Sequence, residues 1–162
     1  MRRRFVAGNW KMNKTTAESV VLARELVKAL SGTEAEVVIC PSYVSLVSVA
    51  EALKGSHIAL GAQDVHFEPR GAFTGKVSCE MLQSAGVKHV IIGHSEQRAF
   101  FHETDDFVNK KIKATLKSGL LPIICVGETL SEREKEITAQ VVKTQVEGAY
   151  RGLSEAEAQK TV

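Results

Sequence analysis

Apolar residues recur along the chain in five short runs that are rich in β-branched side chains. The runs predict strands near residues 4–9, 36–40, 58–62, 89–93 and 122–126. Each run is almost continuously hydrophobic instead of alternating with polar residues, which is typical of strands buried on both faces of a parallel sheet. The pattern therefore predicts five parallel strands.

Amphipathic stretches with helix start signals lie between these runs. Thr15 and Glu18 form a capping-box pattern that is followed by apolar residues at helical spacing. Thr129 and Glu132 form a second capping box, which predicts one long charged helix running toward Tyr150. Further helical segments are expected at 41–53, 104–116 and from residue 154 onward. Strands and helices thus alternate five times.

This alternation leaves two architectures open. Five strand–helix units in 162 residues average about 32 residues each, so eight would need about 260, close to the size of a (β/α)₈ barrel. A complete five-stranded doubly wound domain fits the same spacing, and for this length it is the better guess from the pattern alone. Either way, we expect one domain over residues 1–162.

Composition narrows the class of protein. The chain is 44% hydrophobic and 25% charged, as globular domains are, and its net charge of +2 gives no reason to expect nucleic acid or a membrane as a partner. No apolar stretch approaches the ~20 residues of a membrane helix. The odd number of cysteines, Cys40, Cys79 and Cys125, without metal-ligand spacing, indicates reduced thiols in a cytoplasmic protein.

Polar residues gather where the predicted strands end. They are Asn9, Lys11, Ser42, Gln63, Asp64, His94, Glu96 and Glu128. His94 lies between a predicted strand and a helix, where the positive helix N-terminus favours a neutral imidazole that can donate a proton to a substrate oxygen. Lys11 follows the first strand, from which it can reach an anionic ligand. In a barrel these strand ends share one face, where catalytic sites are built.

Four segments carry a resemblance to the triosephosphate isomerase family. They are GNWKMN at 8–13, GAFTG at 71–75, IIGHSEQR at 91–98 and CVGE at 125–128. The resemblance covers the whole chain and favours the (β/α)₈ barrel over the doubly wound fold, with strands in the sequential order 1-2-3-4-5. It implies an incomplete barrel of about five βα units that ends at the start of strand six, and therefore a fragment truncated before the catalytic glutamate.

The resemblance also implies an activity and a set of roles. The family interconverts dihydroxyacetone phosphate and D-glyceraldehyde 3-phosphate through an enediolate, in glycolysis and gluconeogenesis and without a cofactor or metal; its carboxylate base and neutral histidine are well established. By resemblance, His94 polarises the carbonyl, Lys11 stabilises the phosphate and the developing charge, and Asn9 hydrogen-bonds the substrate oxygen. Glu96 holds the lysine. Because the base is absent, we expect this chain alone to be inactive or a very poor isomerase.

The segment Gln63 to Gly75 predicts a protruding loop. In the family this loop, with Phe73, Thr74 and Gly75, inserts into a second subunit, so the resemblance implies a homodimer; Lys76 stands where family members often carry glutamate. Two non-catalytic alternatives remain open: a phosphate-binding α/β module, or a folding fragment that self-associates through the exposed edges of its first and fifth strands.

Overall fold

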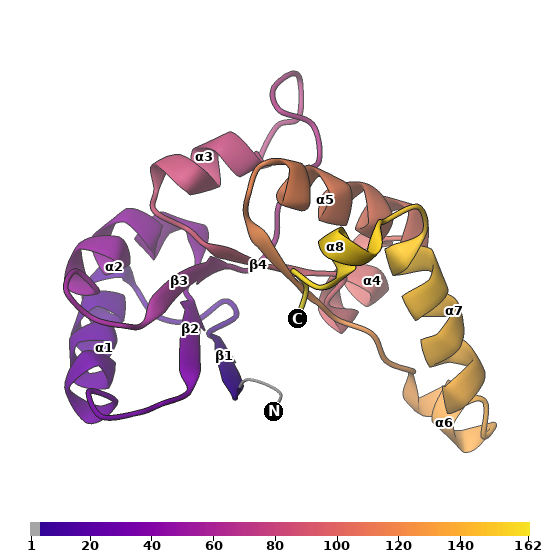
Figure 1. The fold of residues 1–162 in the computed structure, drawn as a ribbon, viewed down its shortest axis with the longest axis horizontal. Helices are drawn as coiled ribbons and strands as arrows, with labels where there is room; N and C mark the ends of the chain where they lie inside the picture. The colour runs from indigo at the N-terminus through magenta and orange to yellow at the C-terminus, as the bar shows by residue number, and fades with distance from the viewer. Residues whose placement is uncertain (1–3) are drawn as a thin grey trace.

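The computed structural model describes residues 4–162, and within that range one curled parallel sheet of five strands forms the centre of the molecule (Figure 1). The strands are β1 (Phe5–Asn9), β2 (Glu36–Cys40), β3 (Ala59–Ala62), β4 (His89–Ile92) and β5 (Leu121–Ile124). They pair in the order β1-β2-β3-β4-β5, every pair parallel. The predicted strands and their sequential order are confirmed.

The helices follow the outer side of the curl, and Figure 1 shows them passing from α1 and α2 at the left, over α3, to α5 and α7 at the right. Their bounds are α1 (Thr16–Ala29), α2 (Leu46–Ala52) after a 3₁₀ turn (Tyr43–Ser45), α3 (Cys79–Ser84), α4 (Ser95–Phe101), α5 (Asp105–Lys117), α6 (Leu130–Glu134), α7 (Thr138–Tyr150) and α8 (Glu155–Ala158). A doubly wound sheet would reverse its strand order and carry helices on both faces. The arrangement is instead that of an open, incomplete (β/α)₈ barrel.

Burial of both sheet faces explains why the strand sequences are continuously apolar. The larger hydrophobic cluster lies between the sheet and the helices, whereas Val38, Cys40 and Ile91 form a smaller cluster with partly buried neighbours, among them Ile123. All four residues of β4 are buried. β1, at the edge of the sheet, is far less covered, and Val6 is 58% exposed. Burial on both faces therefore holds for the middle of the sheet and fails at its edge.

Helix caps follow the predicted sequence signals. Thr15, Thr129 and Ser154 each accept a hydrogen bond from the backbone N–H three residues later, and the glutamate at that position bonds back to the cap N–H. These bonds hold the pKa of Glu18 and of its two counterparts below the ordinary carboxyl value. Each box satisfies helix-end donors that would otherwise lack a partner.

The prediction of one long helix from Thr129 toward Tyr150 was wrong. The helix ends at Glu134, because Glu136 adopts the left-handed conformation with φ +57° and turns the chain before α7 begins. The Ile137 N–H then reaches back to the Glu132 carbonyl at 3.2 Å, and the Glu136 N–H to the Arg133 carbonyl at 2.9 Å. This pair of bonds is a Schellman ending built without glycine.

Val162 lies beside the last strand. Its N–H donates to the Pro122 carbonyl at 3.0 Å, and its own carbonyl accepts from the Ile124 N–H at 2.7 Å. These two bonds, from one residue to two residues spaced by two along β5, follow the pattern of a parallel ladder. The outer edge of β5 is therefore already engaged by the backbone of Val162.

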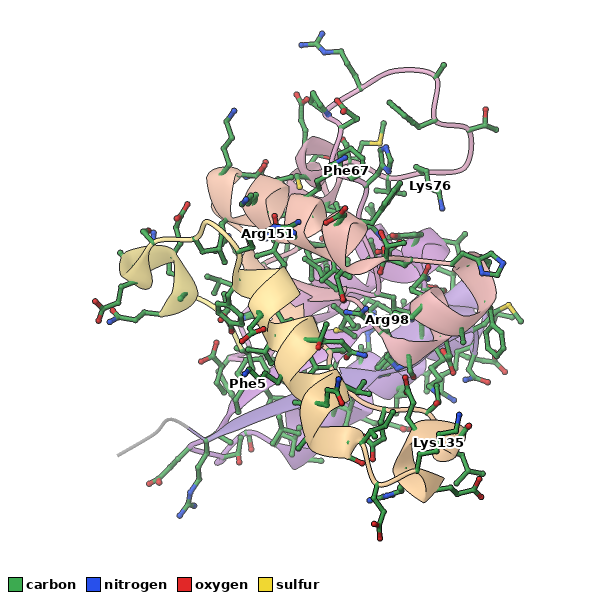
Figure 2. All side chains as sticks on the ribbon, turned by 90° about the vertical axis from the view of Figure 1, so that its right-hand side faces the viewer. Phe5, Phe67, Lys76, Arg98, Lys135 and Arg151 are labelled. Carbon is green, nitrogen blue, oxygen red and sulfur yellow. The ribbon has the colours of Figure 1, made fainter. Side chains whose placement is uncertain are left out.

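The connection between β3 and α3 projects from the rim of the sheet. Figure 1 shows it rising above α3 and α5, and Figure 2 shows the same loop from the side, with Phe67 and Lys76 labelled on it. The predicted protruding loop is thus present. No helix within residues 4–162 is long and apolar enough to cross a membrane.

Candidate active site

Lys11 follows β1 and has an unusual backbone. Its φ of +54° lies in the left-handed region, which is uncommon for a residue with a side chain. The Asn9 side-chain oxygen accepts the Lys11 N–H at 3.0 Å, so the end of β1 fixes the peptide on its N-terminal side. The Lys11 ammonium then donates to the Glu96 carboxylate at 2.6 Å.

His94 is the N-cap residue of α4, at the end of the turn that follows β4. Gly93 precedes it with φ +74°, and the Arg98 Nε donates to the Gly93 carbonyl at 3.0 Å, which pins the turn. The His94 Nδ1 accepts the Glu96 N–H at 3.2 Å, whereas the Glu96 carboxylate is 3.6 Å from that nitrogen. Accepting this hydrogen bond requires the tautomer of His94 that carries its proton on Nε2, and from there the proton can be donated to a ligand.

Glu96 links the two residues. The hydrogen bond from the Lys11 ammonium, together with the charge of that ammonium, holds the pKa of the Glu96 carboxyl below its ordinary value, although burial acts in the opposite direction. The side chains of the Lys11–Glu96 pair are 51% and 42% exposed. The ion pair therefore forms at a surface that a ligand can reach.

These side chains share one cavity. It has a volume of about 440 Å³, and its lining includes Asn9, Lys11, His94 and Glu96 together with Gln63. Ser42 and Asp64 line a neighbouring cavity of about 250 Å³, which also contains Lys11. Glu128 lies with His94 in a third cavity of about 340 Å³, and its carboxylate is 3.5 Å from the Arg133 Nε. The strand ends thus meet at one face, but not all of their polar residues enter one site.

Gln63 has a role that the sequence did not reveal. Its side-chain amide donates to the Lys11 carbonyl and to the Cys40 carbonyl, each at 2.9 Å. The only sequence signal was the position of Gln63 after a predicted strand. Its partners are 52 and 23 residues away along the chain, and no local pattern indicates them.

The loop that begins at Gln63 is braced by an aromatic stack. The His66 ring lies 4.5 Å from the ring of Phe67 and 4.4 Å from that of Phe73, centroid to centroid. Phe73 remains 42% exposed at the outer part of the loop. Three further apolar side chains near the site cavity are also exposed: Met12 (96%), Phe100 (72%) and Phe101 (67%).

The cysteines have no geometry for nucleophilic or metal chemistry. Cys40 and Cys79 are buried, and burial raises the pKa of the Cys40 thiol to about 12. Burial also raises the pKa of Cys125. In the part of the chain that the structure describes, no group of three or more His, Cys, Asp or Glu side chains is close enough to hold a metal ion.

Comparison with known proteins gives a consistent answer. The family model described as triosephosphate isomerase matches residues 4–162. A triosephosphate isomerase of Carboxydothermus hydrogenoformans is 54% identical over 160 residues, covering 98% of this chain and 64% of that protein. One from Clostridium botulinum is 48% identical over 162 residues, covering all of this chain and 65% of its own length.

The fold agrees with the sequence match. The crystal structure of triosephosphate isomerase from Bartonella henselae superposes with a TM-score of 0.92 at 40% identity, covering 99% of this chain and 66% of that chain. The chain therefore spans about two thirds of the length of these relatives. The family match over nearly all of its residues, supported by this superposition, shows that the chain belongs to the triosephosphate isomerase family.

Proposed function

We propose that this chain supplies the carbonyl-polarising and charge-neutralising part of a triosephosphate isomerase site, acting on dihydroxyacetone phosphate and D-glyceraldehyde 3-phosphate. The observation that carries the proposal is the convergence of Asn9, Lys11, His94 and Glu96 on one cavity. A neutral His94 with its proton on Nε2 can donate to a substrate carbonyl oxygen. The Lys11 ammonium stabilises the phosphate and the negative charge that develops on the enediolate.

The reaction also needs a base that takes a proton from carbon. Among the described carboxylates that line the cavities beside His94, Glu96 is bonded to Lys11 and Glu128 lies against Arg133. Each is paired with a cation, which makes a carboxylate a weaker base. We propose that the base is supplied by the part of the family's length that this chain does not span. The 162-residue chain alone then lacks a general-base contribution of roughly 10²–10⁴-fold and has at most weak turnover.

The experiment compares the 162-residue chain alone with the same chain mixed with a polypeptide that carries strands six to eight of a relative. We expect isomerase turnover many orders of magnitude below that of a full-length relative for the chain alone, and a gain on mixing. The gain disappears in Lys11→Ala and in His94→Ala. Lys14→Ala and His57→Ala are the matched controls, because each removes a lysine or histidine outside the site cavity, and they retain the gain.

Two results would overturn this function. Efficient turnover by the chain alone that depends on His94 would require a base within it. Binding of glycerol 3-phosphate without any turnover, even in the mixture, would instead favour a phosphate-binding module.

We also propose that the chain acts in the cytoplasm, in glycolysis and gluconeogenesis, and forms a homodimer through the loop that contains Phe73, Thr74 and Gly75. The exposure of Phe73 on the loop, together with the exposure of Met12, Phe100 and Phe101 at the site cavity, supports an apolar contact between two copies. Sedimentation equilibrium tests it: Phe73→Ser weakens the dimer, whereas a purely monomeric wild-type chain contradicts it.

A further inference from the structure

The left-handed backbone conformation of Lys11 requires contacts that stabilise it. A left-handed conformation is unfavourable for a residue with a Cβ atom and persists only where surrounding contacts enforce it. The Asn9 oxygen holds the Lys11 N–H, but this bond leaves the following carbonyl free to rotate. The direction of that peptide decides where the Cα–Cβ bond points, and therefore where the ammonium can reach.

Gln63 supplies the contact on the carbonyl side. It follows β3, and its Nε2 donates two hydrogen bonds, one to the Lys11 carbonyl and one to the Cys40 carbonyl at the end of β2. The Cys40 carbonyl also accepts the Trp10 N–H at 3.1 Å. One amide group thus joins the ends of three adjacent strands through the loop that carries Lys11.

We propose that Gln63 is a positioning residue, which fixes the Lys11 carbonyl and thereby aims the ammonium at Glu96 and into the site cavity. An amide nitrogen carries two N–H donors, so one side chain can bond two carbonyls at once. A shorter or apolar side chain at this position cannot reach both. The consequence for catalysis rests on the proposed function, whereas the effect on the direction of Lys11 does not.

The ionisation of Glu96 provides a readout of where Lys11 points. The largest cause of the lowered pKa of Glu96 is the hydrogen bond from Lys11. If Gln63→Met lets the Lys11 peptide relax, that bond weakens and the pKa of Glu96 rises toward its ordinary value. NMR titration of the glutamate side-chain carbons measures the change without any substrate.

Controls separate this effect from a general loss of structure. Glu18 lies in the capping box of α1, and its lowered pKa serves as an internal reference for the folded chain. Gln145→Met is the matched variant, since Gln145 also makes two side-chain bonds to a loop backbone, both to Gly127. We expect Gln145→Met to leave the pKa of Glu96 unchanged.

A second variant and a double-mutant cycle complete the test. Gln63→Asn keeps a neutral amide but is one methylene shorter, so it should also raise the pKa of Glu96. If Gln63→Met does not fold, Gln63→Asn tests the proposal in its place. In a Lys11→Met background, Gln63→Met has no further effect on Glu96, because the effect passes through Lys11. An unchanged pKa of Glu96 in both Gln63 variants, with Glu18 still lowered, overturns the proposal.

The same samples separate this proposal from the proposed function. In the mixture with strands six to eight, Gln63→Met lowers kcat/KM by a smaller factor than Lys11→Ala does, if the proposed function holds. Absence of turnover in every sample contradicts that function. The pKa of Glu96 then still tests whether Gln63 positions Lys11.

Discussion

Two lysines in this chain make ion pairs at the same distance in opposite environments. The Lys11 ammonium lies 2.6 Å from Glu96, with side chains 51% and 42% exposed. The Lys111 ammonium lies 2.6 Å from Asp64, with side chains 7% and 13% exposed. Lys111 also contacts Glu103, whose side chain is 5% exposed.

The buried group joins the base of the projecting loop to α5 and to the turn before α5. Asp64 stands at the base of the projecting loop, Glu103 connects α4 with α5, and Lys111 lies within α5. Tyr43 lies near the same group, since burial and the charges of Asp64 and Glu103 raise the pKa of its phenol. The group therefore fixes the loop base and the end of α4 relative to α5.

The difference separates an exposed ion pair in the candidate site from a buried one that stabilises the fold. Exposed pairs contribute about 0–1 kcal/mol to folding, because water already solvates both charges. Removing one partner of a buried pair costs about 3–5 kcal/mol, since the remaining charge has lost its hydration. Lys11 is thus available for a ligand at little cost in stability, whereas Lys111 is committed to the fold.

The largest expected effect is that of Lys111→Met. It leaves Asp64 and Glu103 buried without their cation, so the free energy of unfolding should fall by about 3–5 kcal/mol, a large part of the 5–15 kcal/mol that is typical of a domain. Urea denaturation measures it. The control is Lys110→Met, the adjacent but exposed lysine, whose ammonium lies 5.3 Å from the Phe67 ring centroid. That change should lower the free energy of unfolding by at most about 1 kcal/mol. Equal losses of stability in the two variants would contradict the view that Lys111 is buried at structural cost and Lys110 is not.

A smaller effect is expected when the whole buried group is made neutral. The triple change Asp64→Asn, Lys111→Met and Glu103→Gln removes the isolated charges that make the single change costly. The triple variant should therefore be more stable than Lys111→Met, because neutral replacement of a buried ionic group is often tolerated. The same denaturation assay measures the difference. A triple variant less stable than the single one would show that the charges themselves stabilise the fold.

Lys11→Met should change stability by at most about 1 kcal/mol, because its ion pair is exposed. The same change removes the main cause of the lowered pKa of Glu96, which should rise toward 4.5. Thermal unfolding and NMR titration measure the two quantities on one sample. A large loss of stability would mean that Lys11 supports the fold as Lys111 does.

The smallest expected effect is a dependence of stability on pH through His66. Burial, and then the charges of Lys111 and Lys76, lower the pKa of His66 below 6.5, although Glu68 and Asp64 act in the opposite direction. As pH falls below about 6.5, the unfolded chain binds a proton that the folded chain does not, so stability decreases.

The free energy of unfolding, measured against pH, should show this decrease. In His66→Gln the free energy of unfolding should change less with pH between pH 7 and the folded-state pKa of His66. Lys111→Met removes one of the charges that lower the pKa of His66 and should therefore raise that pKa. If the same pH dependence of stability persists in His66→Gln, another titratable group is its cause.

Local signals were sufficient for most of the secondary structure. Continuous apolar runs marked the five strands to within one or two residues at each end, since burial on both faces requires apolar side chains throughout. Capping boxes marked the starts of α1 and α6, because the bonds that form them lie within four consecutive residues. The motifs predicted Asn9, Lys11, His94 and Glu96 as candidate site residues, and the structure brings these four residues to one cavity.

Other features were not found in this way. The turn at Glu136 ends α6 through local bonds, but it contains neither glycine nor proline, so no residue type marks it in the sequence. Lys110 and Lys111 are neighbours with the same chemistry, yet one is exposed and the other buried. Their environments differ only because α5 packs its Lys111 side toward Asp64 and Glu103.

By itself, the sequence determined the alternation of strands and helices, the family and the chemical groups of the candidate site. These depend on side-chain character and on spacing over a few residues. Only the tertiary structure decided that Gln63 holds the Lys11 carbonyl and that Lys111 is the buried cation. The physical reason is that hydrogen bonding and burial at these positions depend on groups that are far away along the chain, 47 residues from Lys111 to Asp64 and 52 from Gln63 to Lys11. These groups meet only when the strands curl side by side.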